Sequence, residues 1–271
     1  FVPFRTREWD LTTDRALDAT LRRGRDLRVE LVDAEGRPIP GAKVRADIAG
    51  LALSRDGARL VSASNDQTVR LWRLDGADAP GAEPGHRMPV VGVDIAGDGA
   101  TLVSASYDQT VRTWDAATGA PRAILRGHHG RIWSVKFIPG SPLAISASND
   151  ATLRLWDVAR GVAVAELRGH GAPVFDVAVT ADGRTAASGS SDGTVRLWDL
   201  PAGAPRRTID VGSRVDGVAL SPDGRLVAAG TSSHLVAIFD AATGAPRQVL
   251  RGHRAAVPGV AFSPDATRYR R

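Results

Sequence analysis

The chain has 271 residues, of which 43% are hydrophobic and 24% charged, so it can form the packed core of one large all-β domain or of two ordinary domains. It contains no cysteine, which excludes a disulfide framework, a thiolate nucleophile, a cysteine-ligated zinc site and an iron–sulfur cluster. The 35 basic residues exceed the 30 acidic ones, but only Lys43 and Lys136 are lysines, and a general bias towards arginine accounts for the excess better than a basic patch.

The sequence shows no apolar run near the roughly 18 residues that a membrane-spanning helix needs. Its opening, FVPFRTREWD, carries charges where a secretory signal would have an apolar stretch. We therefore expect a cytoplasmic protein with no membrane partner.

Residues 1–22 are predicted to contain two strands, over 6–11 and 16–21, the first of which includes the pair Trp9-Asp10. Residues 26–46 form an insertion. Apolar and polar residues alternate on both sides of its turn sequence EGRPIPGA, which predicts a β-hairpin whose role the sequence leaves open.

Residues 47–250 contain five similar units. A tryptophan recurs at intervals of 42 residues, and a phenylalanine takes its place 41 residues after the last, at Trp72, Trp114, Trp156, Trp198 and Phe239. The sequence that ends at each tryptophan also recurs, as SASNDQTVRLW, SASYDQTVRTW, SASNDATLRLW and SGSSDGTVRLW. A histidine stands 28 residues before three of the tryptophans, at His86, His128 and His170.

Within each unit the apolar residues alternate over segments of about five to seven residues, which is typical of strands. Asp-Gly pairs tolerate positive φ at both residues, and they predict a tight hairpin in four units, at Asp56-Gly57, Asp98-Gly99, Asp182-Gly183 and Asp223-Gly224. Each unit then holds four short strands, and four strands in a period near 42 residues predict the blades of a β-propeller.

Residues 251–271 repeat the start of a unit and are predicted to supply the inner strands of a closing blade, to which residues 1–22 add the outer strands. Placed after Arg271, Trp9 would fall within one residue of the repeat register. The sequence thus predicts a single domain of six blades, one of them composite, which removes two exposed sheet edges. A truncated longer propeller is the alternative, because it would also begin and end within a blade.

Gly-His and Trp-Asp pairs at these spacings, such as Gly127-His128 and Trp156-Asp157, make the chain resemble the WD-repeat (WD40) β-propeller family over about nine tenths of its length. The resemblance implies an all-β propeller of four-stranded antiparallel blades. It further implies a non-catalytic scaffold for protein–protein interaction, with no cofactor and no metal. The bias towards arginine and alanine favours a bacterial sensor or scaffold module, or a fragment of a larger protein.

The resemblance also implies a hydrogen-bonded chain of four side chains inside a blade. Its members are a histidine before the inner strand, a serine on the second strand, a turn aspartate and the tryptophan of the third strand. Three complete tetrads are present: His86, Ser104, Asp108 and Trp114; His128, Ser146, Asp150 and Trp156; His170, Ser188, Asp192 and Trp198. In each, four buried polar groups would satisfy one another.

Two units depart from the tetrad pattern. The first keeps Ser62, Asp66 and Trp72 but has Val44 in the place of the histidine. The fifth replaces the serine, aspartate and tryptophan by Ala229, Ser233 and Phe239. We expect these two blades to be held by packing alone. The arginine two residues before each repeat tryptophan is expected to be a solvated charge on the strand, at Arg70, Arg112, Arg154 and Arg196.

In the family, binding usually falls on the rim of the central tunnel, at the residues that open the inner strands and at the residue before the turn aspartate. Carried over, the partner-binding residues are Tyr107, Arg131, Trp133, Asn149, Pro173, Phe175, Arg214 and Asp216. Trp133 falls outside the 42-residue pattern, although an aromatic at its place can also pack between blades. Aromatic and arginine side chains are typical of binding hot spots, so we expect a protein or peptide partner at this rim.

Catalysis and nucleic-acid binding are the alternatives. Ser, His and Asp recur at one spacing in three units, which fits a structural network better than a single catalytic triad. A propeller hydrolase or lactonase would use acids in the tunnel, where Asp94, Asp176 and Asp216 are candidates without neighbouring histidines. Arginine-mediated nucleic-acid binding, which the dispersed arginines disfavour, would appear as salt-dependent retention on DNA or heparin.

Overall fold

The computed structural model describes residues 18–19, 31–32, 48–54, 57, 59–73 and 83–263, and within them every regular element is a β-strand. That part of the chain accordingly contains no helix long and apolar enough to cross a membrane. Five four-stranded antiparallel sheets form the blades, and a separate two-stranded sheet pairs β1 (Asp18–Ala19) with β2 (Leu31–Val32). The pairing joins the predicted 16–21 strand to the predicted 26–46 hairpin, a contact that the sequence does not predict.

Each blade is a meander of four strands in chain order. Blade one contains β3 (Ile48–Leu53), β4 (Arg59–Ser64), β5 (Thr68–Arg73) and β6 (Glu83–Pro84). Blade two contains β7 (Val90–Ile95), β8 (Thr101–Ser106), β9 (Val111–Asp115) and β10 (Pro121–Leu125). Blade three contains β11 (Ile132–Phe137), β12 (Leu143–Ser148), β13 (Leu153–Asp157) and β14 (Val162–Leu167). Blade four contains β15 (Val174–Val179), β16 (Thr185–Ser190), β17 (Thr194–Asp199) and β18 (Ala204–Asp210). Blade five contains β19 (Val215–Leu220), β20 (Leu226–Thr231), β21 (Val236–Asp240) and β22 (Pro246–Leu250).

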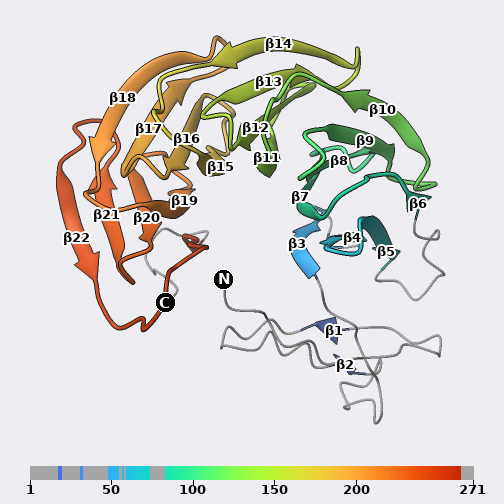
Figure 1. Cartoon of the computed structure of the whole chain (residues 1–271). Helices are drawn as coiled ribbons and strands as arrows, with labels where there is room; N and C mark the ends of the chain where they lie inside the picture. The colour runs from blue at the N-terminus through green and yellow to red at the C-terminus, as the bar shows by residue number, and fades with distance from the viewer. Residues whose placement is uncertain are drawn as a thin grey trace.

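The blades follow one another around a common centre, with the first strand of each blade inside and the last outside (Figure 1). The inner strands of successive blades contact one another, from β3 through β7, β11 and β15 to β19. This is the architecture of a β-propeller, so the predicted fold class is confirmed.

The hydrophobic core lies between neighbouring blades. One cluster joins Val103 of blade two to Ile132 and Trp156 of blade three. The repeat residues Trp114 and Trp198 lie in the equivalent interfaces with blades one and three. Replacing a buried aromatic side chain by alanine costs about 3–5 kcal/mol, so the 42-residue tryptophan pattern marks the residues that hold one blade to the next.

The Asp-Gly pairs lie in turns that join the first and second strands of their blades, as predicted. The glycine has positive φ, between 69° and 71° in the four turns, and its amide donates to the carbonyl of the residue three before it. In three of the turns the aspartate has no positive φ and accepts a main-chain N–H two residues on, at Asp98, Asp182 and Asp223. The carboxylate therefore stabilises the turn by a hydrogen bond.

Residues 257–262 occupy the place of a further inner strand beside blade five. Val257 is buried against Ala228, and its amide donates to the carbonyl of Thr231 at 3.1 Å. A Cβ on Gly217 of β19 would come within 2.6 Å of the Pro258 carbonyl oxygen, so the two segments stack closely. The remainder of the predicted closing blade, within residues 1–17 and 264–271, lies outside the described residues, as does most of the 26–46 hairpin. The number of blades therefore stays a prediction.

Candidate functional site

A β-bulge places the second residue of each inner strand outside the regular pairing. In β11 the register passes from Ile132 to Ser134 and skips Trp133. The same irregularity skips Phe175 in β15 and Asp216 in β19. A bulge turns a side chain out of the regular alternation, so three blades present the same repeat position at one end of the propeller.

Aromatic rings from three successive blades contact one another at this end. The Tyr107 ring, from the turn after β8, packs edge to face with Trp133 at a centroid distance of 4.9 Å. Trp133 packs in the same manner against Phe175 at 5.5 Å. Such contacts contribute about 0.5–1.5 kcal/mol beyond the area that they bury. All three side chains are half-buried, and each therefore keeps part of its ring surface accessible.

An arginine covers each end of this aromatic chain. The guanidinium carbon of Arg131 lies 5.0 Å from the centroid of Tyr107, and that of Arg214 lies 5.4 Å from the centroid of Phe175. Both distances fall within the range of cation–π attraction. Both arginines are exposed.

Polar contacts fix the orientation of these side chains. The Trp133 indole N–H donates to the side-chain oxygen Oδ1 of Asn149 at 2.6 Å. The main-chain N–H of Asn149 donates to the main-chain carbonyl of Arg131 at 2.9 Å. Arg214 Nε donates to Asp216 Oδ1 at 2.8 Å, in a pair whose carboxylate is only 11% exposed. Burial raises the pKa of the Tyr107 phenol, against the opposing influence of Arg131, so the phenol stays protonated at neutral pH.

The structure brings seven predicted rim residues into one group, here called the rim cluster: Tyr107, Arg131, Trp133, Asn149, Phe175, Arg214 and Asp216. Pro173, the eighth, precedes β15 at the repeat position of Arg131, and its carbonyl accepts the amide of Ser191 at 2.8 Å. Pro173 thus links the segment before β15 to the turn after β16, and it adds neither an aromatic ring nor a charge to the rim cluster.

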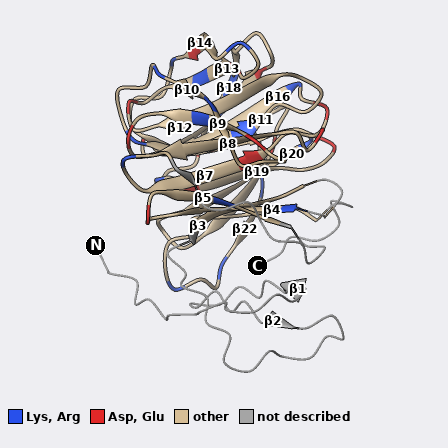
Figure 2. Ribbon diagram, turned by 90° about the vertical axis from the view of Figure 1, so that its right-hand side faces the viewer, with Lys and Arg blue, Asp and Glu red and all other residues tan. Residues whose placement is uncertain are grey.

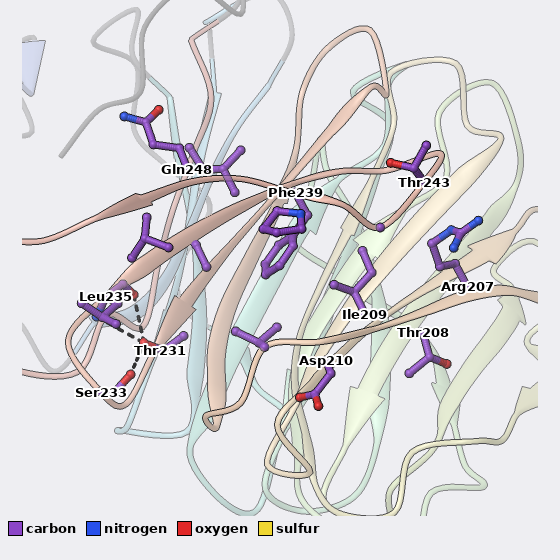
Figure 3. Close-up of a pocket in the computed structure, with 16 residues that line it drawn as sticks. Arg207, Thr208, Ile209, Asp210, Thr231, Ser233, Leu235, Phe239, Thr243 and Gln248 are labelled. Carbon is purple, nitrogen blue, oxygen red and sulfur yellow. Dashed lines mark hydrogen bonds between the residues drawn. The ribbon is translucent and has the colours of Figure 1, made fainter.

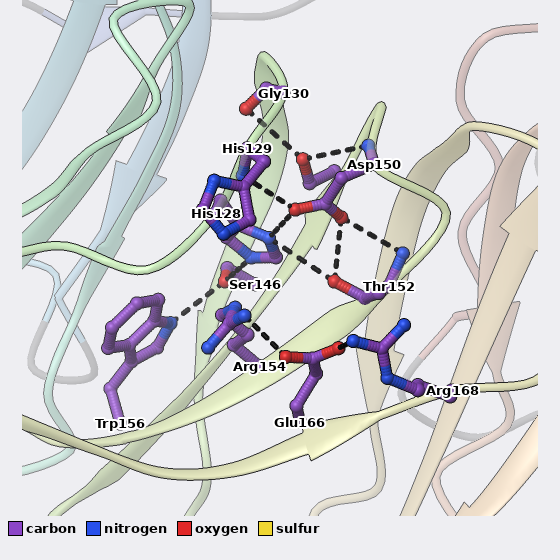
Figure 4. Close-up of polar contacts among 11 residues, drawn as sticks. His128, His129, Gly130, Ser146, Asp150, Thr152, Arg154, Trp156, Glu166 and Arg168 are labelled. Carbon is purple, nitrogen blue, oxygen red and sulfur yellow. Dashed lines mark hydrogen bonds and ion pairs between the residues drawn. The ribbon is translucent and has the colours of Figure 1, made fainter.

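The three tetrads form the hydrogen-bonded chains that the resemblance implies. In blade three, His128 Nδ1 lies 2.8 Å from Asp150 Oδ2, and its Nε2 lies 2.8 Å from Ser146 Oγ (Figure 4). The Trp156 indole N–H donates to the same Ser146 oxygen at 2.8 Å. Blades two and four repeat the arrangement within 0.1 Å. Side chains so completely paired are structural elements of the blade rather than reactive groups.

A threonine extends each tetrad and was missed in the sequence. Thr152 Oγ1 donates to Asp150 Oδ1 at 2.6 Å, and its amide donates to the same oxygen at 3.0 Å. Thr110 and Thr194 do the same in blades two and four. The signal was available, because a threonine recurs two residues after the turn aspartate in the first four units.

The arginines before the repeat tryptophans correct one expectation. Arg70 is exposed, as predicted, but the other three are partly buried, at Arg112, Arg154 and Arg196. Arg154 pairs with Glu166 of β14, which also contacts Arg168 (Figure 4). A Cβ on Gly169 would lie 2.7 Å from Arg196 Nη1. The guanidinium of Arg196 therefore packs against the Gly-His pair and leaves little room for a side chain in place of Gly169. The prediction of a fully solvated charge was wrong for Arg112, Arg154 and Arg196.

The incomplete tetrads correct another expectation. In blade one the Trp72 indole still donates to Ser62 Oγ at 2.9 Å, so packing alone does not hold that blade. Val44 lies outside the described residues. In blade five, Ala229 and Phe239 are buried, and a cavity of about 390 Å³ that Phe239 lines lies between β18 and the strands β20 to β22 (Figure 3).

The acids proposed for tunnel chemistry are occupied by main-chain contacts. Asp94 accepts the amide of Phe137 in the next blade at 2.8 Å, and Asp176 accepts the amide of Val218 at 3.0 Å. Burial raises the pKa of both carboxyls, and Lys136 and these amides act in the opposite direction. Among the described residues, no three His, Asp or Glu side chains gather as a metal-binding group. These acids join neighbouring inner strands.

Comparison with known proteins identifies the repeats. The family described as WD domain, G-beta repeat matches four segments, residues 40–73, 82–115, 119–157 and 161–199, which together make up more than half of the chain. No curated protein matches the sequence significantly. Each match ends with the third strand of one of blades one to four, and the last three matches begin with the outer strand of the preceding blade. Blade five shares the strand order and register of these blades. The chain belongs to the WD-repeat family.

Proposed function

We propose that this protein is a non-catalytic scaffold that binds a protein or peptide partner through the rim cluster. WD repeats indicate an interaction scaffold in general. The proposal for the rim rests on the aromatic chain that links blades two, three and four.

The fold itself does not require aromatic side chains at these places. The repeat position of Trp133 is held by Val91 in blade two and by Asp216 in blade five, and both blades form the same sheet. The position of Tyr107 is held by Ser191 in blade four. Half-buried rings flanked by exposed arginines have the composition of interface hot spots, and this supports a role in binding rather than in folding.

We further propose a cellular setting on compositional grounds. The bias towards arginine and alanine supports a bacterial sensor or scaffold module, or a fragment of a larger protein, and the absence of cysteine fits a cytoplasmic setting.

The test is capture of partners from the lysate of the native host, read by mass spectrometry. We compare the wild type with the variant Tyr107→Ala, Trp133→Ala, Phe175→Ala. The matched control is Val162→Ala, Val164→Ala, which removes two exposed apolar side chains from the outer strand β14. Circular dichroism and thermal unfolding establish that each variant is folded.

We expect a partner that the wild type and the β14 control both bind and that the triple variant loses. Binding of that partner is then repeated with purified components. If all three proteins capture the same set, the rim cluster is not the binding site.

A further inference from the structure

We infer that the rim cluster binds an acidic, extended peptide segment, with carboxylates on Arg131 and Arg214 and an apolar side chain against the rings between them. The inference rests on the proposed function and adds the chemistry of the partner.

The acidic residues nearest the rim cluster are already engaged. The turn aspartates of the tetrads are bound by histidine, threonine and main-chain N–H groups, and their side chains are 9% to 16% exposed, at Asp108, Asp150 and Asp192. Asp216 is equally covered and pairs with Arg214. The accessible charges of this cluster are therefore the two arginines.

The opposite end of the blades shows a different balance. There, arginines pair with aspartates of the same blade, as Arg122 does with Asp115 and Arg247 with Asp240, at 2.6 Å in both cases. Arg122 and Arg247 are thus neutralised within their own blades, whereas the rim cluster has two arginines, Arg131 and Arg214, for the one carboxylate of Asp216. Complementary potential guides association and selects partners, so the rim cluster favours a negatively charged segment.

The orientation of the arginines leaves their donors free for a ligand. Arg131 stacks over Tyr107 and has no acidic partner among the described residues. Arg214 uses its Nε on Asp216, so its two terminal nitrogens remain available. A guanidinium that stacks through its plane still presents N–H groups along its edge, and these match a carboxylate in a bidentate manner.

The spacing of the arginines limits the length of the segment. Successive distances of 5.0, 4.9, 5.5 and 5.4 Å connect Arg131 through the three rings to Arg214, so the two guanidinium carbons are at most about 21 Å apart. An extended chain rises about 3.4 Å per residue. The two acidic residues of the partner are therefore separated by no more than about six positions.

The same features favour a peptide over single-stranded nucleic acid. Base stacking needs open ring faces, whereas a guanidinium covers one face of Tyr107 and one face of Phe175. The Trp133 indole N–H is already used by Asn149. On the side that Figure 2 shows, Lys and Arg positions are also scattered over the ribbon among Asp and Glu positions.

The experiment selects binders from a display library of random twelve-residue peptides on the purified full chain. The best peptides are then titrated against the variants Arg131→Gln and Arg214→Gln. Arg122→Gln and Arg247→Gln are the matched controls, because they remove the same charge at the opposite end. A ten-nucleotide oligo(dT) is titrated in parallel.

We expect selected peptides to carry Asp or Glu at two positions up to about six residues apart, with an aromatic or aliphatic residue between them. Affinity should fall roughly tenfold for each rim arginine that is replaced, stay unchanged in the controls, and weaken with added salt.

Three results would overturn the inference. Selected peptides that carry Lys or Arg, or no charge, and that require the three aromatic residues would refute the acidic partner while the rim site stands. A library that yields no rim-dependent peptide would refute a peptide partner, and lysate capture would then decide the function separately. Oligo(dT) that binds more tightly than any peptide, with the same arginine dependence, would favour nucleic acid.

Discussion

The buried imidazole of His170 is held in its neutral form. His170 Nδ1 lies 2.8 Å from Asp192 and its Nε2 lies 2.7 Å from Ser188, whose oxygen also accepts the indole N–H of Trp198. Because the ionised carboxylate of Asp192 can only accept, Nδ1–H donates to it. The neutral ring then has an unprotonated Nε2, to which the Ser188 hydroxyl donates while its oxygen accepts the indole N–H. Burial lowers the pKa of His170 below the ordinary 6.5, although Asp192 acts in the opposite direction.

This assignment predicts how pH changes the contribution of His170. The unfolded chain binds a proton near pH 6.5 and the folded chain binds it at lower pH, so stability is lost as pH falls through that interval. His170→Ala should reduce the free energy of unfolding by about 1–3 kcal/mol at pH 8, because Asp192 and Ser188 lose their partner. The difference from wild type should narrow between pH 7 and pH 5, measured by urea unfolding.

His129→Ala removes an exposed histidine beside His128 in the sequence and is the control, which should leave the free energy of unfolding at pH 8 nearly unchanged. A wild-type advantage that grows on acidification would mean that the folded protein holds an imidazolium. Asp192 adds a second pH dependence of stability. Burial acts to raise its pKa, but hydrogen bonds outweigh burial and lower the pKa to about 2. Its contribution to the free energy of unfolding is therefore complete above about pH 3.8 and is lost as pH falls towards 2.

At the residue scale, the sequence predicts the place of those residues that recur at a fixed position of the repeat. The tetrads and the rim residues follow from the resemblance to the family, which assigns them to fixed positions of the repeat. The β-bulge at Trp133 could not be predicted, because it is a property of strand pairing. The partial burial of Arg154 was missed for a similar reason: its partner Glu166 lies on the next strand and has no counterpart in the other units.

At the element scale, blade five shows what a blade loses without its tetrad. Phe239 stands where the other units have tryptophan, and Ala229 stands where they have serine. Both pair in the same register as Trp198 and Ser188 of blade four. The cavity beside Phe239 leaves space for a larger side chain (Figure 3).

The double substitution Ala229→Ser, Phe239→Trp should therefore rebuild one hydrogen bond of the tetrad. Phe239→Trp alone buries an indole N–H without its acceptor, and Ala229→Ser alone buries a hydroxyl without its donor, so each single change is expected to destabilise. Together they should show a favourable coupling of about 1–2 kcal/mol in a double-mutant cycle of urea unfolding.

Blade four gives the matched control in the reverse direction. Ser188→Ala and Trp198→Phe should show a coupling of similar size, because their hydrogen bond is 2.9 Å long and buried. If the changes in blade five are additive within about 0.5 kcal/mol, the two positions do not meet as the register implies.

At the scale of the whole molecule, each blade depends on its neighbours for its core, since the hydrophobic clusters join consecutive blades. Main-chain amides reinforce these contacts, with Asp94 and Asp176 each bonding to the next inner strand. The last described segment continues the pattern, because Val257 packs on blade five as an inner strand would. A single further strand leaves an unpaired edge unless other segments of chain complete its sheet.

The sequence register predicts that residues 1–22 supply the outer strands of that sheet. A protein without residues 1–22 should then lose several kcal/mol of stability and expose a strand edge that promotes association. Adding a synthetic peptide of residues 1–22 should restore the thermal midpoint in proportion to its concentration, because a ligand of the folded state stabilises by mass action. Differential scanning calorimetry measures both effects.

A peptide with the composition of residues 1–22 in scrambled order is the control and should have no effect. If deletion leaves the thermal midpoint unchanged and the peptide does not bind, residues 1–22 do not close the ring. The longer propeller that the sequence also allows would then be the better interpretation, and the edge beside residues 257–262 would be completed by further blades. The outcome therefore distinguishes a six-bladed ring from a longer one by a property of the whole molecule, its closure.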